Sequence, residues 1–324
     1  MMLPKRLHAL GVLGINARNQ KYTLRVNERR FYPLVDDKLA TKRMCQEAGI
    51  PVPRLLAVAE VHAQAKRLLP QLAGEKAFVL KPARGAMGNG ILVIDVREGK
   101  MMRGSRVVSA DDFVYHAAGI ISGLYSLAGH ADVAMVEEKL VIDARIAHLA
   151  VDGVPDLRVI VYRGIPVMAM TRLPTSMSGG RANLHQGALG VGIDLGTGET
   201  THAMFRGESI AKHPDNGHAL IGFLIPSFDD VLTTAVSAAA RTGLGYVGAD
   251  VVIDANLGPA ILELNARPGL AIQLANRAGL GPRLDAVDEA LGEWKKGESN
   301  DMSIEARVAL GREVARIAQA RRAA

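Results

Sequence analysis

The chain has 324 residues, of which 48% are hydrophobic and 22% charged, a composition typical of a globular protein with one large domain or two to three small ones. A single cysteine, Cys45, excludes an intrachain disulfide and predicts a reducing, cytoplasmic compartment. The net charge of +6 favours anionic ligands.

The first 35 residues are basic and show no regular apolar period. We interpret residues 1–35 as an arm that packs over a neighbouring lobe and presents Arg29 and Arg30 to an anionic ligand; a solvated arm is the alternative. The next segment, 36–48, predicts a helix, because acidic residues at its start complement the helix dipole and Gly49 suits its end.

Alternating apolar patterns then predict strand 54–59, helix 60–73 and strand 76–80. The last strand delivers Lys81 to the sequence KPARGAMGNGILVI, in which three glycines lie within six residues. Glycines permit positive φ and expose backbone N–H groups, which is how a loop wraps phosphate oxygens. The pattern is neither a P-loop nor a dinucleotide fingerprint, because a strand follows instead of a helix. We therefore predict a phosphate-binding loop, with a glycine-rich hairpin as the alternative.

The middle of the chain predicts a helix, a strand and a hairpin. Residues 97–108 form a polar turn region, and Ser109 suits the N-cap of a helix over 110–128. The apolar strand 132–142 carries acidic residues, which either mark its emergence into solvent or read the adenine and ribose of a nucleotide. Residues 157–173 predict two strands about an Arg-Gly turn.

Arginines gather around this hairpin. Arg158 and Arg172 frame it, and Arg181 follows in a glycine-rich segment with Asn183 and His185. Arginines are rarely gathered without an anion or carboxylates to neutralise them. We interpret the three arginines as anion binders; an ordinary polar loop is the alternative for Arg181 and His185.

The sequence GYVGADVVIDANLGPAILELNARPG predicts two strands, 249–254 and 259–265, joined by a four-residue turn. Side chains alternate across a strand, so Glu263 and Asn265 share one face, and this turn length pairs Asp250 with Glu263 on that face. A slip of one residue would move Asp250 to the opposite face. Three oxygen-bearing side chains suit a hard cation such as Mg²⁺, whereas solvated acids on the outside of a hairpin are the alternative.

Helices are predicted around the acidic hairpin. One begins at Ser227 or Asp229 and ends before Gly243, two short ones follow the hairpin, and a charged amphipathic helix begins near residue 303. We divide the chain into a basic arm, an N-terminal lobe with the glycine-rich loop, a C-terminal lobe with the metal site and a C-terminal helix: residues 1–35, 36–135, 136–295 and 296–324.

Several motifs follow one another along the chain in a characteristic order: DKLATK in the first helix, Lys81 with the glycine-rich loop, EEKL, the basic hairpin, NLHQG and ELNARPG. Over roughly residues 33 to 290 this order resembles the ATP-grasp carboxylate–amine ligases. The resemblance is closest to α-L-glutamate ligase-like proteins, which are related to the ribosomal-protein S6 glutamate ligase, and to sugar-transfer-associated ATP-grasp proteins. It implies an α+β ATP-grasp fold of two lobes, whose antiparallel sheets are flanked by helices and hold a nucleotide in a cleft between them.

The resemblance also implies roles for single residues. The residues implied to bind ATP are Lys42, Lys81, Arg84, Gly85, Gly88, Asn89, Gly90, Glu137, Glu138, Lys139, Leu140 and, at the ribose, Asp143. Those implied to contact the γ-phosphate or an acyl-phosphate are Arg158, Arg181, Asn183 and Arg267. The implied Mg²⁺ ligands are Asp250, Glu263 and Asn265.

The implied activity is ADP-forming ligation of a carboxylate to an amine through an acyl-phosphate, with glutamate or a similar amino acid added to an unidentified acceptor. The partners would be a small-molecule, peptide or glycan carboxylate acceptor and an amino-acid donor. The alternatives are a non-catalytic nucleotide-binding module of a larger assembly and an ATP-dependent phosphotransferase. We expect neither a membrane span nor nucleic-acid binding, because long apolar runs, zinc-ligand spacings and basic strips with interleaved aromatics are absent from the sequence; a homo-oligomer is compatible with it.

Overall fold

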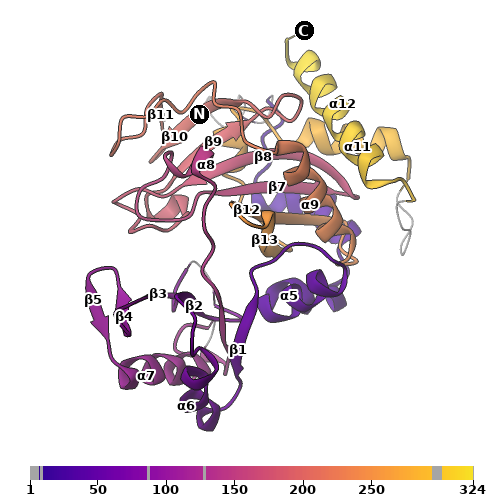
Figure 1. Ribbon diagram of the computed structural model, residues 1–324. Coiled ribbons are helices and arrows are strands. Elements are labelled where there is room, and N and C mark those ends of the chain that lie inside the picture. Colours follow the sequence, from indigo (N-terminus) through magenta and orange to yellow (C-terminus); the bar gives the residue numbers. More distant parts are fainter. Residues whose placement is uncertain (1–6, 8–9, 86–87, 127–128, 294–300, 324) are drawn as a thin grey trace. The chain divides into compact units, whose positions relative to one another are not determined.

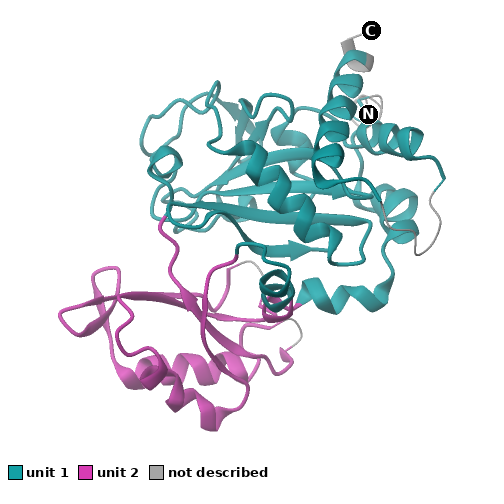
Figure 2. Ribbon diagram, turned by 45° about the vertical axis from the view of Figure 1, so that its right-hand side comes forward, with its two compact units in different colours: residues 1–36, 41–51, 142–324 teal, residues 37–40, 52–141 magenta. Residues whose placement is uncertain are grey.

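The structure is a computed structural model that describes residues 7, 10–85, 88–126, 129–293 and 301–323. The chain forms two compact units (Figure 2). Unit 1 comprises residues 1–36, 41–51 and 142–324, and unit 2 comprises residues 37–40 and 52–141. The segments that the sequence suggested as an arm and as a C-terminal helix both belong to unit 1. The chain passes from unit 2 to unit 1 after Val141. The sequence analysis placed the boundary between the two lobes earlier, at residue 135.

Unit 2 is built on a six-stranded antiparallel sheet in the order β1-β6-β2-β3-β4-β5 (Figure 1). Its strands are β1 Leu55–Ala59, β2 Ala77–Pro82, β3 Leu92–Arg97, β4 Lys100–Arg103, β5 Arg106–Val108 and β6 Ala134–Glu138. Its helices are α6 His62–Gln71 and α7 Ala110–Ile121. The predicted N-cap of α7 is confirmed, since Ser109 Oγ accepts the backbone N–H of Asp112 at 3.0 Å.

Two expectations for unit 2 were wrong in detail. The polar region 97–108 forms β4 and β5 instead of plain turns, because tight turns with positive φ at Gly99 and Gly104 reverse the chain and let short polar segments pair at the sheet edge. The helix expected over 110–128 ends at Ile121. Gly123 has φ +83°, and a Cβ there would lie 2.4 Å from the carbonyl oxygen of His130, so the chain must turn at this glycine.

Unit 1 is built on a seven-stranded antiparallel sheet in the order β11-β10-β9-β8-β7-β12-β13. Its strands are β7 Asp156–Tyr162, β8 Ile165–Leu173, β9 Leu189–Ile193, β10 Thr200–Phe205, β11 Glu208–Ile210, β12 Tyr246–Asp254 and β13 Gly258–Asn265. Its helices after residue 142 are α8 Ala144–Ala147, the 3₁₀-helix η4 Leu184–Gln186, α9 Phe228–Ala240, α10 Ile272–Ala275, α11 Gly281–Leu291 and α12 Ile304–Ala323. Helix α9 packs against β7, β8, β12 and β13, and α10 packs against β8, β9 and β10.

The described part of the N-terminal segment is helical, which corrects the expectation of an irregular arm. It contains α2 Ile15–Arg18, the π-helix η1 Asn19–Thr23, α3 Leu24–Val26, the 3₁₀-helix η2 Arg29–Phe31 and α4 Tyr32–Asp36. Asn27 anchors the segment to β12, because its carboxamide donates to the carbonyl of Tyr246 at 2.8 Å and accepts the Tyr246 N–H at 2.7 Å. Arg30 pairs with Glu28 at 3.3 Å, and the presentation of Arg29 and Arg30 to an anion stays a prediction.

Helix α5, Lys38–Glu47, occupies the predicted helical segment, but the helix is separate from α4. Asp37 separates the two helices and caps α5, since its Oδ1 accepts the N–H of Leu39 at 2.9 Å and of Ala40 at 3.1 Å. Gly49 ends this segment with φ +67°. Cys45 is buried on α5, and burial raises the pKa of its thiol to about 11, against which nearby Lys42 acts. Cys45 is therefore a core residue.

Both predicted hairpins of unit 1 are confirmed. Arg163 and Gly164 form the turn between β7 and β8 with φ +51° and +80°, the positive values that a tight hairpin turn requires. In the acidic hairpin Asp250 pairs with Glu263, as predicted. The turn itself is one residue shorter than expected, and Leu262 forms a β-bulge that restores the pairing, because Val251 pairs with Ile261.

A buried apolar cluster covers part of the unit 1 sheet. It joins Ile160 of β7 and Tyr246 of β12 to Leu284 of α11 and to Tyr22 of the N-terminal segment. Side chains alternate along a strand, so Arg158, two residues before Ile160, lies on the same face of the sheet. None of the described helices combines the length and the apolar content that a bilayer crossing requires.

Candidate functional site

In unit 2 a buried ion pair involves Lys81, on the strand that leads into the glycine-rich loop. Lys81 is the last but one residue of β2, and Glu137 lies on the neighbouring strand β6. The Lys81 Nζ–Glu137 Oε1 distance is 2.5 Å, and the two residues are only 7% and 4% exposed. An ammonium group carries three N–H donors, so contact with one carboxylate oxygen leaves donors for a phosphate oxygen.

The glycine-rich loop is anchored at both ends. At its start the backbone N–H of Arg84 donates to both carboxylate oxygens of Asp132, at 3.0 and 3.1 Å. At its end His116 Nε2 lies 2.9 Å from the carbonyl oxygen of Gly90. A Cβ on Gly90 would lie 2.6 Å from the Tyr125 ring, so this position requires glycine. Gly88 adopts φ +75°, whereas residues 86 and 87 of the predicted loop lie outside the described residues.

The side chain of Arg84 is already paired within unit 2. Its Nε donates to Asp37 Oδ2 at 3.0 Å, while the other oxygen of Asp37 caps α5. Lys38 Nζ donates to the carbonyl oxygen of Gly85 at 2.6 Å. The first turn of α5 thus holds the start of the loop, and a phosphate role for Arg84 stays a prediction.

The predicted adenine hinge begins where β6 ends. Glu138 accepts the backbone N–H of Arg54 at 2.7 Å, and Lys139 Nζ donates to Asp95 of β3 at 2.6 Å. These contacts hold both side chains against the sheet. The backbone of Lys139 and Leu140 continues beyond the last residue of the strand ladder, where its polar groups are available to an adenine edge.

In unit 1 two arginines and two aspartates form one buried network across three adjacent strands. Arg158 of β7 donates twice to Asp250 of β12, with Nε–Oδ1 and Nη2–Oδ2 distances of 2.8 and 2.7 Å. Arg172 of β8 donates to the same Asp250 Oδ2 at 2.7 Å. Arg172 also bridges to Asp156 of β7 through Nε at 2.6 Å and through a second short contact. Each aspartate is therefore held by a bidentate or shared guanidinium, the strongest type of charge-assisted pairing.

Burial and charge act on the two carboxyl groups of this network in opposite directions. Burial raises the pKa of Asp156 to about 6, an effect that Arg172 opposes and the negative charge of Asp250 reinforces. Burial also acts to raise the pKa of Asp250, but Arg158 and Arg172 together outweigh it and hold this pKa well below its ordinary value. Asp250 therefore stays ionised at neutral pH and holds both arginines.

Glu263 and Asn265 of β13 lie beside this network. The carboxamide of Asn265 donates to Glu263 Oε1 at 3.2 Å and to Asp250 Oδ2 at 3.4 Å, which places the three predicted metal ligands on one face. A carboxylate has about four lone-pair positions. On Asp250, Oδ2 accepts from Arg158 Nη2, Arg172 Nη2 and the Asn265 carboxamide, whereas Oδ1 accepts from Arg158 Nε.

This arrangement fits Mg²⁺ through Glu263 and Asn265, whose carboxylate and carboxamide oxygens are hard donors. The Asp250 oxygen that could take part is Oδ1, because Oδ2 already accepts three N–H groups. Within the described residues no group of three or more His, Cys, Asp and Glu side chains is arranged to hold a metal ion. The full three-residue ligand set remains a prediction.

The segment after β13 crosses back over β12. A Cβ on Gly248 would lie 2.5 Å from Cβ of Pro268, so the glycine lets this segment lie directly on the strand. The next residue, Gly269, approaches Arg158 Nη1. Arg267 itself lies over the ring of Tyr32, with its guanidinium carbon 4.8 Å from the ring centroid. Its side chain is thus held by α4.

Other predicted residues of unit 1 lie elsewhere. Asn183 caps η4, since its Oδ1 accepts the N–H of His185 at 3.0 Å, and Arg181 is exposed just before it. Asp143 caps α8 and pairs with Arg145 at 2.7 Å; this side-chain bond lowers its pKa. Lys42 is buried in α5, 5% exposed. The structure brings Arg158, Asp250, Glu263 and Asn265 together, whereas these side-chain bonds of Asn183 and Asp143 stay within their own segments.

Sequence reasoning missed three anchoring residues. Arg172 was interpreted only as a general anion binder, and Asp156 and Asp132 were not singled out. Asp156 lies two residues before Arg158, so strand alternation places both on one face, and that spacing was a usable signal. Asp132 is 3% exposed and holds Arg84 from 48 positions away, a contact that no local pattern indicates.

Comparisons with known proteins agree with this architecture. The fold, with two antiparallel sheets flanked by helices, is the ATP-grasp fold: the phosphoribosylamine–glycine ligase of Thermotoga maritima matches with a TM-score of 0.51 and 16% identity over 85% of this chain and 59% of that one. A sequence profile described as sugar-transfer associated ATP-grasp matches residues 17–289, and the chain belongs to this family.

Further solved structures match with lower TM-scores. The ATP-grasp ligase PsnB, complexed with a minimal precursor, has a TM-score of 0.43 and 19% identity over 82% of this chain and 63% of that one. The D-cycloserine synthetase DcsG has a TM-score of 0.47 and 15% identity over 81% of this chain and 71% of that one. The chain thus spans less than two thirds of the length of PsnB. No curated protein gives a significant match, and the relation to the ribosomal-protein S6 glutamate ligase stays a prediction.

Proposed function

We propose that this protein is an ATP-dependent ligase that joins a carboxylate to an amine. The observation that carries the proposal is the register of the acidic hairpin, which sets Glu263 and Asn265 beside Asp250 and its arginine Arg158. Family membership and the anchored glycine-rich loop with its buried Lys81 support it.

In the proposed reaction an oxygen of the substrate carboxylate attacks the γ-phosphorus of ATP, the bond to the β-phosphate oxygen breaks, and ADP leaves. An amine nitrogen then attacks the acyl-phosphate, phosphate leaves, and the amine loses a proton to give the amide. This chemistry needs positioning and charge neutralisation but no covalent protein nucleophile.

Each set of residues has one role in the proposed reaction. Lys81 and backbone N–H groups of the glycine-rich loop bind phosphate oxygens, and the hinge backbone at Lys139 and Leu140 binds adenine. Arg158 orients the transferred phosphoryl group. Glu263 and Asn265 would hold Mg²⁺, which neutralises phosphate charge when bound. The resemblance to glutamate ligase-like proteins makes glutamate the first donor to test.

The test is a coupled assay of ADP release with panels of carboxylates and amines. We expect release that requires both substrates and that Lys81→Ala or Glu263→Ala reduces at least about 100-fold, the scale of losing one essential charge-stabilising group. The exposed residues Lys66 and Glu208 supply matched controls, Lys66→Ala and Glu208→Ala, which should keep full activity. Nucleotide binding without turnover would instead identify a binding module, and a stable phosphorylated product a phosphotransferase.

A further inference from the structure

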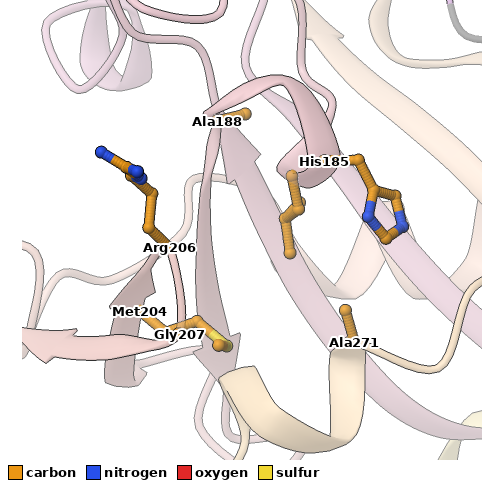
Figure 3. A pocket seen from close by; sticks show the side chains of 7 residues that line it. His185, Ala188, Met204, Arg206, Gly207 and Ala271 are labelled. Carbon is orange, nitrogen blue, oxygen red and sulfur yellow. The ribbon is translucent and has the colours of Figure 1, made fainter.

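Unit 1 contains a cavity of about 230 Å³ that none of the predicted nucleotide or metal residues lines (Figure 3). Its lining comes from η4, from the residue before β9, from β10 and its turn to β11, and from the residue before α10: Leu184, His185, Ala188, Met204, Arg206, Gly207 and Ala271. In Figure 3 Arg206 and His185 lie on opposite sides of the cavity, with Ala188 at the top of the view.

The walls of this cavity are set by two glycines of β9. A Cβ on Gly190 would lie 2.9 Å from the side chain of Leu184, so η4 rests directly on the strand at this position. A Cβ on Gly192 would lie 2.4 Å from the carbonyl oxygen of Ala275, so α10 rests on the strand in the same way. Helices η4 and α10 therefore pack closely on β9 beside the cavity, one through the Leu184 side chain and the other through its backbone.

The loop that carries η4 is itself anchored. Thr175 Oγ1 donates to the carbonyl oxygen of Gly187 at 2.7 Å, and both groups are buried. Asn183 caps η4 at its start. The wall that holds Leu184 is therefore preformed, as is usual for small-molecule sites.

The lining is apolar in its body and cationic at its edge. Leu184, Ala188, Met204 and Ala271 supply aliphatic surface, and no acidic side chain lines the cavity. Arg206 is exposed and makes no ion pair with any described residue. The side chains of His185 and Arg206 are the polar groups of the lining, and the other side chains are aliphatic. A short aliphatic chain that ends in an anion matches both parts.

The charged edge of the cavity lies at a hairpin turn. Arg206 and Gly207 join β10 to β11 with φ +52° and +88°, a tight hairpin turn.

We propose that this cavity binds a small carboxylate with a short, unbranched aliphatic body, whose carboxylate contacts Arg206. Its assignment as a substrate subsite rests on the proposed ligase function. The binding itself does not, because it requires neither ATP nor Mg²⁺.

The probes are hexanoate, 1-hexanol and hexylamine, measured by calorimetry on the full chain without nucleotide. We expect hexanoate to bind at least about tenfold more tightly than hexylamine, because the cavity edge carries positive charge. Arg206→Gln should weaken hexanoate binding to the level of 1-hexanol, and Ala271→Phe should abolish it by filling the cavity. The control Arg241→Gln, at an exposed arginine at the end of α9, should leave the affinity unchanged.

A second readout needs no cavity-filling variant. In protein labelled with ¹³C-methyl methionine, hexanoate should shift the methyl resonance of Met204 and leave those of Met101 and Met102 in unit 2 unchanged. Equal binding of hexanoate and hexylamine, an unaltered affinity in Arg206→Gln, or an unmoved Met204 resonance would each overturn the proposal.

The failure of this proposal and that of the ligase function are distinguishable. Lys81→Ala and Glu263→Ala should bind hexanoate as the wild type does, since neither residue lines the cavity. Hexanoate binding without any substrate-dependent ADP release would support the proposed binding site and contradict the proposed ligase function. If ADP release depends on two substrates but Ala271→Phe leaves it and its KM unchanged, the cavity is not a substrate subsite of the ligase reaction.

Discussion

The two units hold their buried charges in different ways. In unit 2 one ammonium, that of Lys81, touches one carboxylate, that of Glu137. In unit 1 two guanidinium groups are locked to two carboxylates by bidentate and shared hydrogen bonds centred on Asp250. A lysine is a compact charge with rotatable donors, whereas an arginine binds in a fixed planar geometry. Unit 2 therefore presents a cation that can change partners, and unit 1 presents a rigid charged platform.

The difference determines what each unit can offer to a ligand. The ammonium of Lys81 carries three N–H donors, so it can bind a phosphate oxygen while it keeps its contact with buried Glu137. Arg158 cannot leave Asp250 without breaking two hydrogen bonds in a site that is almost fully buried. We expect the platform to hold Glu263 and Asn265 in position and to change little when ligands bind. Four measurements test this contrast, in order of decreasing expected effect.

The largest effect is expected for Asp250→Asn. The substitution removes the charge that neutralises Arg158 and Arg172 and leaves buried guanidinium groups uncompensated. The free energy of unfolding should fall by about 3–5 kcal/mol, measured by urea denaturation. Glu208→Gln, at an exposed position of β11, is the control and should leave the unfolding midpoint unchanged. A loss below about 1 kcal/mol would show that the platform is not rigid.

The pair in unit 2 should behave differently when it is removed in two steps. Lys81→Met takes the ammonium away from buried Glu137 and should lower the free energy of unfolding by roughly 2–3 kcal/mol. Adding Glu137→Gln should restore most of that loss, because both buried charges are then gone. ATP binding should be lost in the single and in the double variant. If the second substitution lowers the free energy of unfolding further, Lys81 and Glu137 resemble the network of unit 1, and the contrast between the units fails.

A smaller effect is expected from pH. The folded-state pKa of Asp156 is raised to about 6, above its unfolded value of about 3.9, so the native state binds the proton more tightly. The wild type should therefore gain stability relative to Asp156→Asn as pH falls from 7 to 5, by about 1–2 kcal/mol. The pKa of Asp250 is lowered, so its contribution is lost only at pH values below this window. Urea denaturation of both proteins across the range measures the difference, and a gain with rising pH would contradict it.

The smallest effect is expected for an exposed ion pair of unit 2. Arg54 and Glu75 lie 2.9 Å apart, with side chains 59% and 25% exposed. Solvent and salt screen such a pair, so Glu75→Gln should change the free energy of unfolding by no more than about 0.5 kcal/mol. The measurement sets the scale against which the two buried sites are judged. A change comparable to that of Lys81→Met would mean that burial does not set the ranking.

Local sequence signals were enough for much of the fold. The Arg163-Gly164 turn and Gly49 after the end of α5 depend on positive φ, and the Ser109 cap depends on a side-chain oxygen, so the residue types identify all three. The alternation of the acidic hairpin likewise placed Glu263 and Asn265 together. Strand β9 could not be recognised from its sequence, LGVGI, because glycine does not favour a strand. Its glycines are there because η4 and α10 pack closely against them.

Contacts that depend on strand order could not be read from the sequence. Asp250 meets Arg158 and Arg172 because β12 lies beside β7 and β7 beside β8, an order set by the packing of the whole sheet. The helical N-terminal segment was missed because its turns are short and its anchors, such as Asn27 on Tyr246, lie more than 200 positions away. The sequence therefore placed Asp250, Glu263 and Asn265 on one face but did not indicate the arginine network around Asp250.

The bulge at Leu262 has a consequence for comparing this chain with its relatives. The turn after Asp254 is one residue short and Leu262 is one residue extra, so the two changes cancel, and Glu263 lies opposite Asp250 at the same interval along the chain as in a four-residue hairpin without a bulge. A relative with a longer turn and no bulge would present its acid opposite the aspartate in the same way. Alignments of this family should allow one gap in the turn and one at the bulge, and the interval between the two acids is a better guide to which acids correspond than the length of the turn.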